Sequence, residues 1–572
     1  MNIRKTHSTV FGLIVVCVFL LKIVYNELSD GIALFDTNST AATVLQPPKI
    51  ASAYTFEPKA HHPVACSPDV PDRFNFQPIR STNRVPMKTL PFDNVTSPNF
   101  TKVTLINPKL RYGLCDRIII RIEAMDNLNR PKLYGEDFFR IKLFSRVPYA
   151  AVIADKFVDY RNGTYLASFP LLWEGLMNIE VLLVHPAEAI PLFSPSLDGQ
   201  RSYAHNYVGE FEMIDDAGVK RAENVDCSER PPKTTFCNFS DPEVYSPFYC
   251  NVPKDKNLTC RHWVAFHQDK IKLLSDLTSE IRGDEVKILE VTRKVVQHGI
   301  RPILVNDEVD SRRQTPGYVP IESLPYCKAS GPPTAHPNGF IFEETWHPFN
   351  CQIAKFTHKE ARDCLSDKML RIYGDSTARQ LYLNLRGKKL CYVKKSLPPS
   401  DDKKRELLCK RGNFTLYFHF HGIPNGGTKR IDNHYAAKEI DNITGGEGSN
   451  EVLLLSYWAH FAISGESYYE KRLRGVKEAI NRLRKRLPGL KLIVRGTNTR
   501  DYVNQGIMLV SSDWHTQRQE MILREVFGDD ASLGYLNAWD ITRAQPFPDL
   551  THPEHPIIDN LINLILTYVC LA

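Results

Sequence analysis

Two short strings in this chain bring together residue types that can carry out acyl-transfer chemistry. The first, Gly374-Asp375-Ser376, puts a serine after a short strand over 368–373 and before a helix expected over 377–385. The second, Asp549-Leu550-Thr551-His552, puts a carboxylate and an imidazole on a loop before a helix expected over 556–569. A serine hydroxyl needs an imidazole base to attack a carbonyl, and the base needs a carboxylate to orient it. We therefore expect Ser376 as nucleophile, His552 as base and Asp549 as orienting acid.

The residues around Ser376 also fit an oxyanion site. Gly374 ends the strand and Asp375 leads into the helix, so the serine lies at a helix N-terminus, which offers backbone N–H groups and a positive partial charge. A structural alternative stays open, because Asp375 or Ser376 is also a good helix N-cap. His555 competes with His552 for the role of base, since it follows on the same loop.

Alternating strands and helices are expected to position these strings. Continuous apolar runs over 452–456 and 490–494 indicate buried parallel strands, and apolar residues recur every three or four positions over 473–487, which indicates a helix between them. Residues 341–572 therefore form a predicted α/β domain. The opposite face of that helix is rich in lysine and arginine, which indicates either a solvated face or attraction of an anionic glycan or acyl donor.

The rest of the chain divides into four predicted segments. An apolar run within 1–25 follows Arg4 and Lys5 and predicts an uncleaved signal anchor, with a cleaved signal peptide as the alternative. Residues 26–97 are rich in Pro, Ser, Thr and Asn and predict a stem. Short β-branched and aromatic runs over 98–215 predict a β sandwich. Residues 216–340 predict a cysteine-rich connector with a helix around 270–296.

Cysteines and glycosylation signals indicate a luminal location. Apart from Cys17 in the anchor, twelve cysteines remain, and an even set in an oxidising compartment predicts disulfides. Since none forms a CxxC pair, no metal site is expected. Eight Asn-x-Ser/Thr sequons add candidate glycan acceptors; they are Asn38, Asn94, Asn99, Asn162, Asn238, Asn257, Asn413 and Asn442. Asn162 is also a turn former.

The charge balance argues against nucleic acid as a partner. Lysine and arginine number 72 against 65 aspartates and glutamates, and the net charge of +7 is spread along the 572 residues. A nucleic-acid-binding protein needs a stronger basic bias.

Two sets of motifs resemble a known family. Residues 159–169 (DYRNGTYLASF), followed by Trp173-Glu174-Gly175, resemble the neurexophilin module, and Trp346-His347-Pro348-Phe349-Asn350-Cys351 before the Gly-Asp-Ser string resembles the PC-esterase branch of SGNH-type hydrolases. From about residue 98 the chain looks like a member of the neurexophilin and PC-esterase domain family. The resemblance implies a Golgi or secreted glycoprotein, and O-acetylation of glycans such as sialic acid. The positive charges before the expected anchor predict a type II orientation in the membrane, with the bulk of the chain in the lumen.

Ser376 and His552 match the family's nucleophile and base. Asp549 matches its acid less securely, and Asp540 is the reserve candidate. His460 matches an oxyanion position, although Trp458 stands where relatives carry glycine, and Asn498 ranks below it as a second donor.

The sequence leaves two functions open. The first is an enzyme that transfers an acyl group to a glycan, or hydrolyses an acetyl ester, with no bound cofactor and with acetyl-CoA as a candidate acyl donor. The second is an inactive ligand that binds a cell-surface receptor through the neurexophilin-like module. The expected fold class is multidomain: an all-β immunoglobulin-like sandwich, then an α/β SGNH-hydrolase-like parallel-sheet domain, with an N-terminal membrane anchor.

Overall fold

The computed structural model describes residues 63–66, 91–106, 108–193, 207–268, 281, 283–306, 318–333, 338–392, 406–424, 435–445, 450–501 and 505–571. The predicted anchor over 1–25, most of the predicted stem and Asn38 lie outside these ranges. Within them, no helix is both long enough and apolar enough to cross a bilayer.

Two sheets near the N-terminus share one apolar core. The four-stranded sheet has the order β2-β3-β7-β6, with bounds Lys102–Ile106, Arg117–Glu123, Thr164–Pro170 and Lys156–Asp159. The seven-stranded sheet has the order β14-β8-β4-β5-β17-β18, and β15 also pairs with β8. Its strands are β14 Lys294–Val295, β8 Gly175–His185, β4 Phe138–Arg146, β5 Tyr149–Ile153, β17 Gly339–Phe342, β18 Thr345–Pro348 and β15 Ile303–Val305.

The pattern of β4 explains why these sheets pack. Its even-numbered residues from Phe138 to Phe144 are half-buried, its odd-numbered ones from Phe139 to Ser145 are buried, and Arg146 at its end is exposed. Such alternation turns one face of the strand toward a core. Phe139, Ile141 and Leu143 accordingly lie in a cluster with residues of both sheets.

The predicted connector contains a sheet of its own. Five antiparallel strands run in the order β11-β12-β10-β9-β13, with bounds Phe236–Asn238, Tyr249–Asn251, Lys220–Ser228, Tyr207–Ile214 and Trp263–Gln268. Much of the helix expected around 270–296 lies outside the described residues, which include α5, Asp284–Glu290. A further two-stranded sheet pairs β1, Val64–Cys66, with β16, Tyr318–Pro320.

The C-terminal region is built on a six-stranded mixed sheet of order β20-β21-β19-β22-β23-β24. Their bounds are Glu406–Arg411, Phe414–Phe420, Met369–Gly374, Glu451–Ser456, Lys491–Arg495 and Gly534–Leu536. Neighbouring strands in the run β21-β19-β22-β23-β24 pair in parallel, whereas β20 pairs with β21 antiparallel. All six residues of β22 are buried, as expected for a strand covered on both faces.

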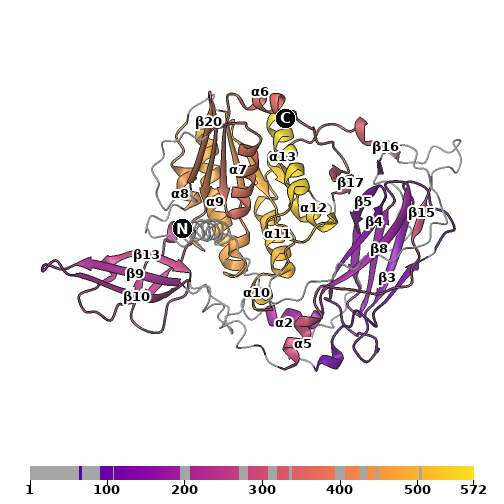
Figure 1. Ribbon diagram of the computed structural model, residues 1–572, viewed down its shortest axis with the longest axis horizontal. Helices are drawn as coiled ribbons and strands as arrows, with labels where there is room; N and C mark the ends of the chain where they lie inside the picture. The colour runs from indigo at the N-terminus through magenta and orange to yellow at the C-terminus, as the bar shows by residue number, and fades with distance from the viewer. Residues whose placement is uncertain are drawn as a thin grey trace, which may run out of the picture. The chain divides into compact units, whose positions relative to one another are not determined.

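Helices cover the two faces of this sheet (Figure 1). Apolar residues of α8 (Ala436–Asp441), α9 (Glu466–Arg486) and α11 (Asp513–Phe527) share a core with Leu453 and Leu455 of β22. Those of α6 (His358–Leu365), α7 (Ser376–Gly387), α12 (Ala538–Ala544) and α13 (His555–Cys570) share another with Val452 and Leu454. Two shorter helices are α2, Ile190–Phe193, and α10, Gln505–Val510.

Short 3-10 helices connect several of these elements. They are η1 Phe92–Asn94, η2 Ala187–Ala189, η3 Pro242–Val244, η4 Cys260–His262, η5 Ile321–Ser323 and η6 Ala459–Phe461.

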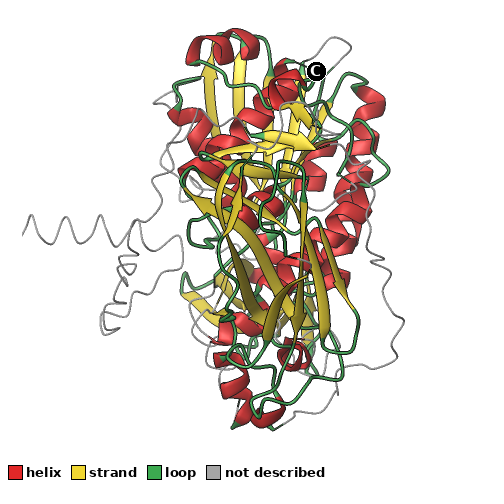
Figure 2. Cartoon of the chain, turned by 90° about the vertical axis from the view of Figure 1, so that its right-hand side faces the viewer, coloured by secondary structure: helices red, strands yellow, loops and turns green. Residues whose placement is uncertain are grey.

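The fold class expected from the sequence is wrong as a description of this chain. The described residues form five sheets, two of which the expected class omits, and strands are prominent throughout (Figure 2). The C-terminal sheet is mixed rather than all-parallel. The two expected domains also interlock, because β17 pairs with β5. The described helices include no membrane span, and the expected anchor itself lies outside them.

The expected disulfide set is confirmed. All twelve cysteines pair, as Cys66–Cys115, Cys227–Cys250, Cys237–Cys260, Cys327–Cys351, Cys364–Cys570 and Cys391–Cys409. Six disulfides indicate an extracellular or secretory-pathway protein.

Candidate active site

Ser376 lies where β19 meets α7, and close backbone packing shapes this junction. A Cβ atom on Gly374 would lie 1.9 Å from the carbonyl oxygen of Ser456 on β22. Only glycine therefore fits at the end of β19. The next residue, Asp375, donates its backbone N–H to the same carbonyl at 3.1 Å, and Ser376 begins the helix.

The buried Asp375 carboxylate holds two segments together. Its Oδ1 accepts hydrogen bonds from the Thr377 N–H at 2.8 Å and the Thr377 Oγ1 hydroxyl at 2.6 Å. Its Oδ2 accepts from the Ala459 N–H at 2.7 Å and the Trp458 N–H at 3.3 Å. Asp375 is thus the N-cap of α7 and also fixes the loop after β22, which settles the question of the cap that the sequence left open.

The Ser376 hydroxyl and the His552 imidazole lie within hydrogen-bonding distance, with 2.8 Å between Oγ and Nε2. His552 comes from the loop between α12 and α13. This loop is tied to α7, because the Gln380 side chain donates to the Pro553 carbonyl at 2.8 Å. As the first residue of α7, Ser376 has no carbonyl one turn earlier in the helix for its N–H. That N–H is therefore suited to binding a developing oxyanion.

The surroundings of His552 favour its neutral, basic form. Packing around the ring lowers the pKa of His552 below its ordinary value; Asp375 opposes this shift, and Arg379 and Arg495 add to it. A neutral imidazole can accept the serine proton at neutral pH.

Asp549 has partners other than the expected histidine. Its carboxylate accepts hydrogen bonds from Arg140 at 2.8 and 3.2 Å, from Arg293, and from the Thr499 hydroxyl at 2.6 Å. Burial alone would raise the pKa of Asp549, but the arginines hold it well below its usual range. Among the hydrogen bonds of the described residues, none joins Asp549 to His552.

The two reserve residues are engaged elsewhere. The Asp540 carboxylate accepts from the Asn537 side chain at 2.5 Å and from the Asn338 N–H at 3.2 Å. His555 is exposed at the start of α13, with its Nδ1 4.0 Å from the Asp559 carboxylate on the same helix.

The expected oxyanion donor Asn498 has other partners, and so has the N–H of Trp458, which stands where relatives carry glycine. The Asn498 amide donates to the carbonyls of Thr499 and Leu550 at 2.8 and 3.1 Å, and its oxygen accepts from Arg495 at 2.7 Å. Asn498 therefore supports the loop that carries His552. The Trp458 N–H is bonded to Asp375.

His460 lies 2.9 Å, Nδ1 to Nε2, from His421. Burial lowers the pKa of His460 to about 4, and its charge interactions include Asp375 and His552. His460 is therefore a neutral group beside the pair.

Arg379 and Gln380 are site residues to which the sequence argument assigned no role at the site. They follow Ser376 by three and four positions, and residues at this spacing share one face of a helix. Helical spacing from the nucleophile was the signal that could have found them.

The sequons occupy mostly exposed positions. Asn94 is half-buried, and its side-chain oxygen accepts from Arg130 at 2.6 Å. The exposed ones are Asn99, Asn162, Asn238, Asn257, Asn413 and Asn442.

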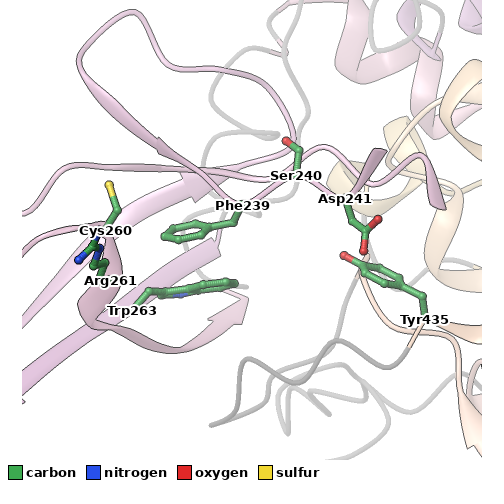
Figure 3. Close-up of a pocket in the computed structure, with 7 residues that line it drawn as sticks. All are labelled: Phe239, Ser240, Asp241, Cys260, Arg261, Trp263 and Tyr435. Atoms are coloured by element: carbon green, nitrogen blue, oxygen red, sulfur yellow. The ribbon is translucent and has the colours of Figure 1, made fainter. Parts of the chain in front are cut away.

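Figure 3 shows a cavity of about 460 Å³ whose lining residues do not include Ser376 or His552. The Phe239 ring stacks on Trp263 there at 4.0 Å between centroids. The other lining residues are Ser240, Asp241, Cys260, Arg261 and Tyr435.

The fold and the site define a disulfide-linked protein of at least two modules, with a serine–histidine pair in the C-terminal one. Residues 104–286 match the neurexophilin family model, and residues 346–570 match the model described as "NXPE family member 4-like, C-terminal domain". The chain belongs to the neurexophilin and PC-esterase domain family. Its C-terminal module is accordingly of an esterase- or acyltransferase-like type.

Proposed function

We propose that this protein is a glycan O-acyltransferase of the secretory pathway, with Ser376 as nucleophile and His552 as general base. The observation that carries the proposal is the 2.8 Å contact between the serine hydroxyl and the histidine Nε2 at the first turn of α7. The esterase- or acyltransferase-like family of residues 346–570 supports the same chemistry.

The proposed reaction has two balanced halves. The Ser376 oxygen attacks the carbonyl of an acyl donor such as acetyl-CoA while His552 takes the hydroxyl proton. The carbonyl–sulfur bond breaks, and the imidazolium returns the proton to the leaving thiolate. His552 then takes a proton from a sugar hydroxyl, whose oxygen attacks the acyl carbon. The bond between that carbon and the Ser376 oxygen breaks, and the imidazolium returns its proton to the Ser376 oxygen. If water replaces the sugar hydroxyl, the outcome is hydrolysis.

The proposed acceptor is a glycan such as sialic acid, and the proposed place is the Golgi lumen or the extracellular space. Exposure of His552 supports access by a bulky acceptor.

The test compares cells that express the wild-type chain with cells that express Ser376→Ala. We expect a fluorophosphonate probe to label the wild type alone, and mass spectrometry of released glycans to show O-acetyl sialate rising only with the wild type. Ser366→Ala removes an exposed hydroxyl at the C-terminus of α6 and is the matched control, expected to behave as wild type. Equal O-acetylation in cells that express the wild type and in cells that express Ser376→Ala would refute the proposed function.

One observation favours a second function, receptor binding by a catalytically inactive chain. The Trp458 N–H and the Asn498 amide are both bonded within the fold, which leaves fewer donors for an oxyanion. Wild-type protein that resists the probe but binds a cell-surface receptor through residues 104–286 would support it.

A further inference from the structure

A buried cluster of four charges joins the neurexophilin module to the loop that carries His552. Arg140 on β4 makes a two-pronged contact with Asp549, at 2.8 Å from Nη1 to Oδ2 and 3.2 Å from Nη2 to Oδ1. Arg293, in the turn after α5, contacts the same carboxylate. Both arginines also reach Asp513 Oδ2 at the start of α11, at 3.2 and 3.1 Å.

Because the cluster is buried, the loss of any one of its four charges is expected to destabilise the fold. The side chains of Asp513 and Asp549 are 0% and 8% exposed, and those of Arg140 and Arg293 are 11% and 19% exposed. The four buried side chains carry two positive and two negative charges, and the more exposed Asp501 contacts Arg293 at 3.5 Å from the edge of the cluster. Removal of one partner from such a buried pair leaves an uncompensated charge, which is strongly destabilising.

The cluster controls one end of the loop, and α7 controls the other. Asp549 is held by the arginines and by Thr499, while the Pro553 carbonyl is held by Gln380. His552 lies between these two anchors, three residues after Asp549. Arg140 and Asp549 are 409 positions apart in the chain, so one module of the protein restrains the histidine of another.

We propose that Arg140 and Arg293 are positioning residues, which act through Asp549 to hold His552 against Ser376. We call this set of contacts, from Arg140 and Arg293 to Asp549, the clamp. The inference rests on the proposed function, because the clamp is assigned to the Ser376–His552 pair. Asp549 then serves as the anchor of the histidine loop, and the neurexophilin module, which contains Arg140, completes the active site.

The test uses the full chain with Arg140→Met, Arg140→Lys, Asp549→Asn and the double variant Arg140→Met/Asp549→Asn. We expect Arg140→Met to slow fluorophosphonate labelling of Ser376 about 10- to 100-fold, since small displacements of a catalytic group have effects of this size. Arg140→Lys keeps the charge but loses the two-pronged contact, so partial recovery is expected. Because Arg140 acts through Asp549, the double variant should lose less than the product of the single losses.

Arg117→Met is the matched control. Arg117, whose side chain is 24% exposed, pairs with Asp155 and Ser168 inside the same module. Within the described part of the chain, its side-chain hydrogen bonds and ion pairs do not reach the histidine loop. We expect it to label at the wild-type rate. Hydrogen exchange of residues 545–553 gives a second readout, and it should accelerate in Arg140→Met and stay unchanged in Arg117→Met.

The outcomes separate the two proposals. A wild type that is never labelled refutes the proposed function, while the exchange data still test the clamp. A labelled wild type overturns the clamp if Arg140→Met labels equally fast, or if the double variant shows simply multiplied losses. If Arg140→Met is not secreted, Arg140→Lys and Asp549→Asn are compared with the wild type instead. Labelling and hydrogen exchange at wild-type rates in both variants would overturn the clamp.

Discussion

Asp375 offers a demanding test of how the site is assembled, because every contact of its carboxylate comes from a donor. Asparagine has the same shape, but one of its two terminal groups is itself a donor. Its best placement keeps the oxygen toward the N–H groups of Trp458 and Ala459 and turns the amide toward Thr377. The Thr377 hydroxyl can rotate to accept, but its backbone N–H then faces another donor. Asp375→Asn therefore leaves at least one buried donor unpaired.

The expected cost follows from these contacts. A buried donor without a partner costs about 1–3 kcal/mol, and loss of the negative charge weakens the remaining two bonds by about 0.5–1 kcal/mol each. We expect Asp375→Asn to lower the free energy of unfolding of the C-terminal module by about 2–5 kcal/mol. Since Asp375 raises the pKa of His552, the same change should move the acidic limb of probe labelling to lower pH.

Urea unfolding followed by tryptophan fluorescence measures the stability, and hydrogen exchange of residues 456–461 reports on the loop after β22. Asp559→Asn is the control, because it breaks only surface contacts, those with Lys388 and His555, and should cost about 0–1 kcal/mol. An Asp375→Asn protein within about 0.5 kcal/mol of wild type, with unchanged exchange in this loop, would refute the reasoning.

Three further changes test other contacts. Arg379→Met removes a positive charge that lowers the pKa of His552, so labelling should fail at a higher pH than in wild type as the solution is acidified; an unmoved limb in a pH series would contradict this. Gly374→Ala forces a Cβ atom against a backbone carbonyl and should cost about 3 kcal/mol in urea unfolding; wild-type stability would show that the strands can separate. Lys132→Met leaves the buried Glu188 carboxylate without its ion pair and should cost about 3–5 kcal/mol, measured as an earlier thermal transition; a normal melting curve would argue against it.

The local part of the site could be predicted from the sequence. Glycine at a strand end, an aspartate able to cap a helix and a serine at its first turn are neighbours, so short-range geometry dictates their arrangement. The contact between Ser376 and His552 was inferred only from chemistry and resemblance, since 176 positions separate them.

The environment of Asp549 could not be predicted, because its arginines come from distant parts of the chain. The spacing of Asp549 and His552 showed only that both could reach one place. Which of several positive groups meets the carboxylate depends on how β4 docks against the loop, and periodicity carries no information about docking.

Short strands and distant strand pairs could not be recognised in the sequence. Strands β11 and β12 have three residues each, too few to show alternation, so residues 216–340 were interpreted as a connector. The pairing of β17 with β5 joins segments about 190 positions apart, and it undid the expected separation of the two domains.

The Cys364–Cys570 disulfide joins α6 to the last turn of α13 across a sequence separation of 206 residues. Closing a loop of this length removes chain entropy worth about 5 kcal/mol from the unfolded ensemble. It also encircles both halves of the serine–histidine pair. A protease that nicks any peptide bond between these cysteines therefore leaves one covalent molecule, and the fragments part on a denaturing gel only after reduction.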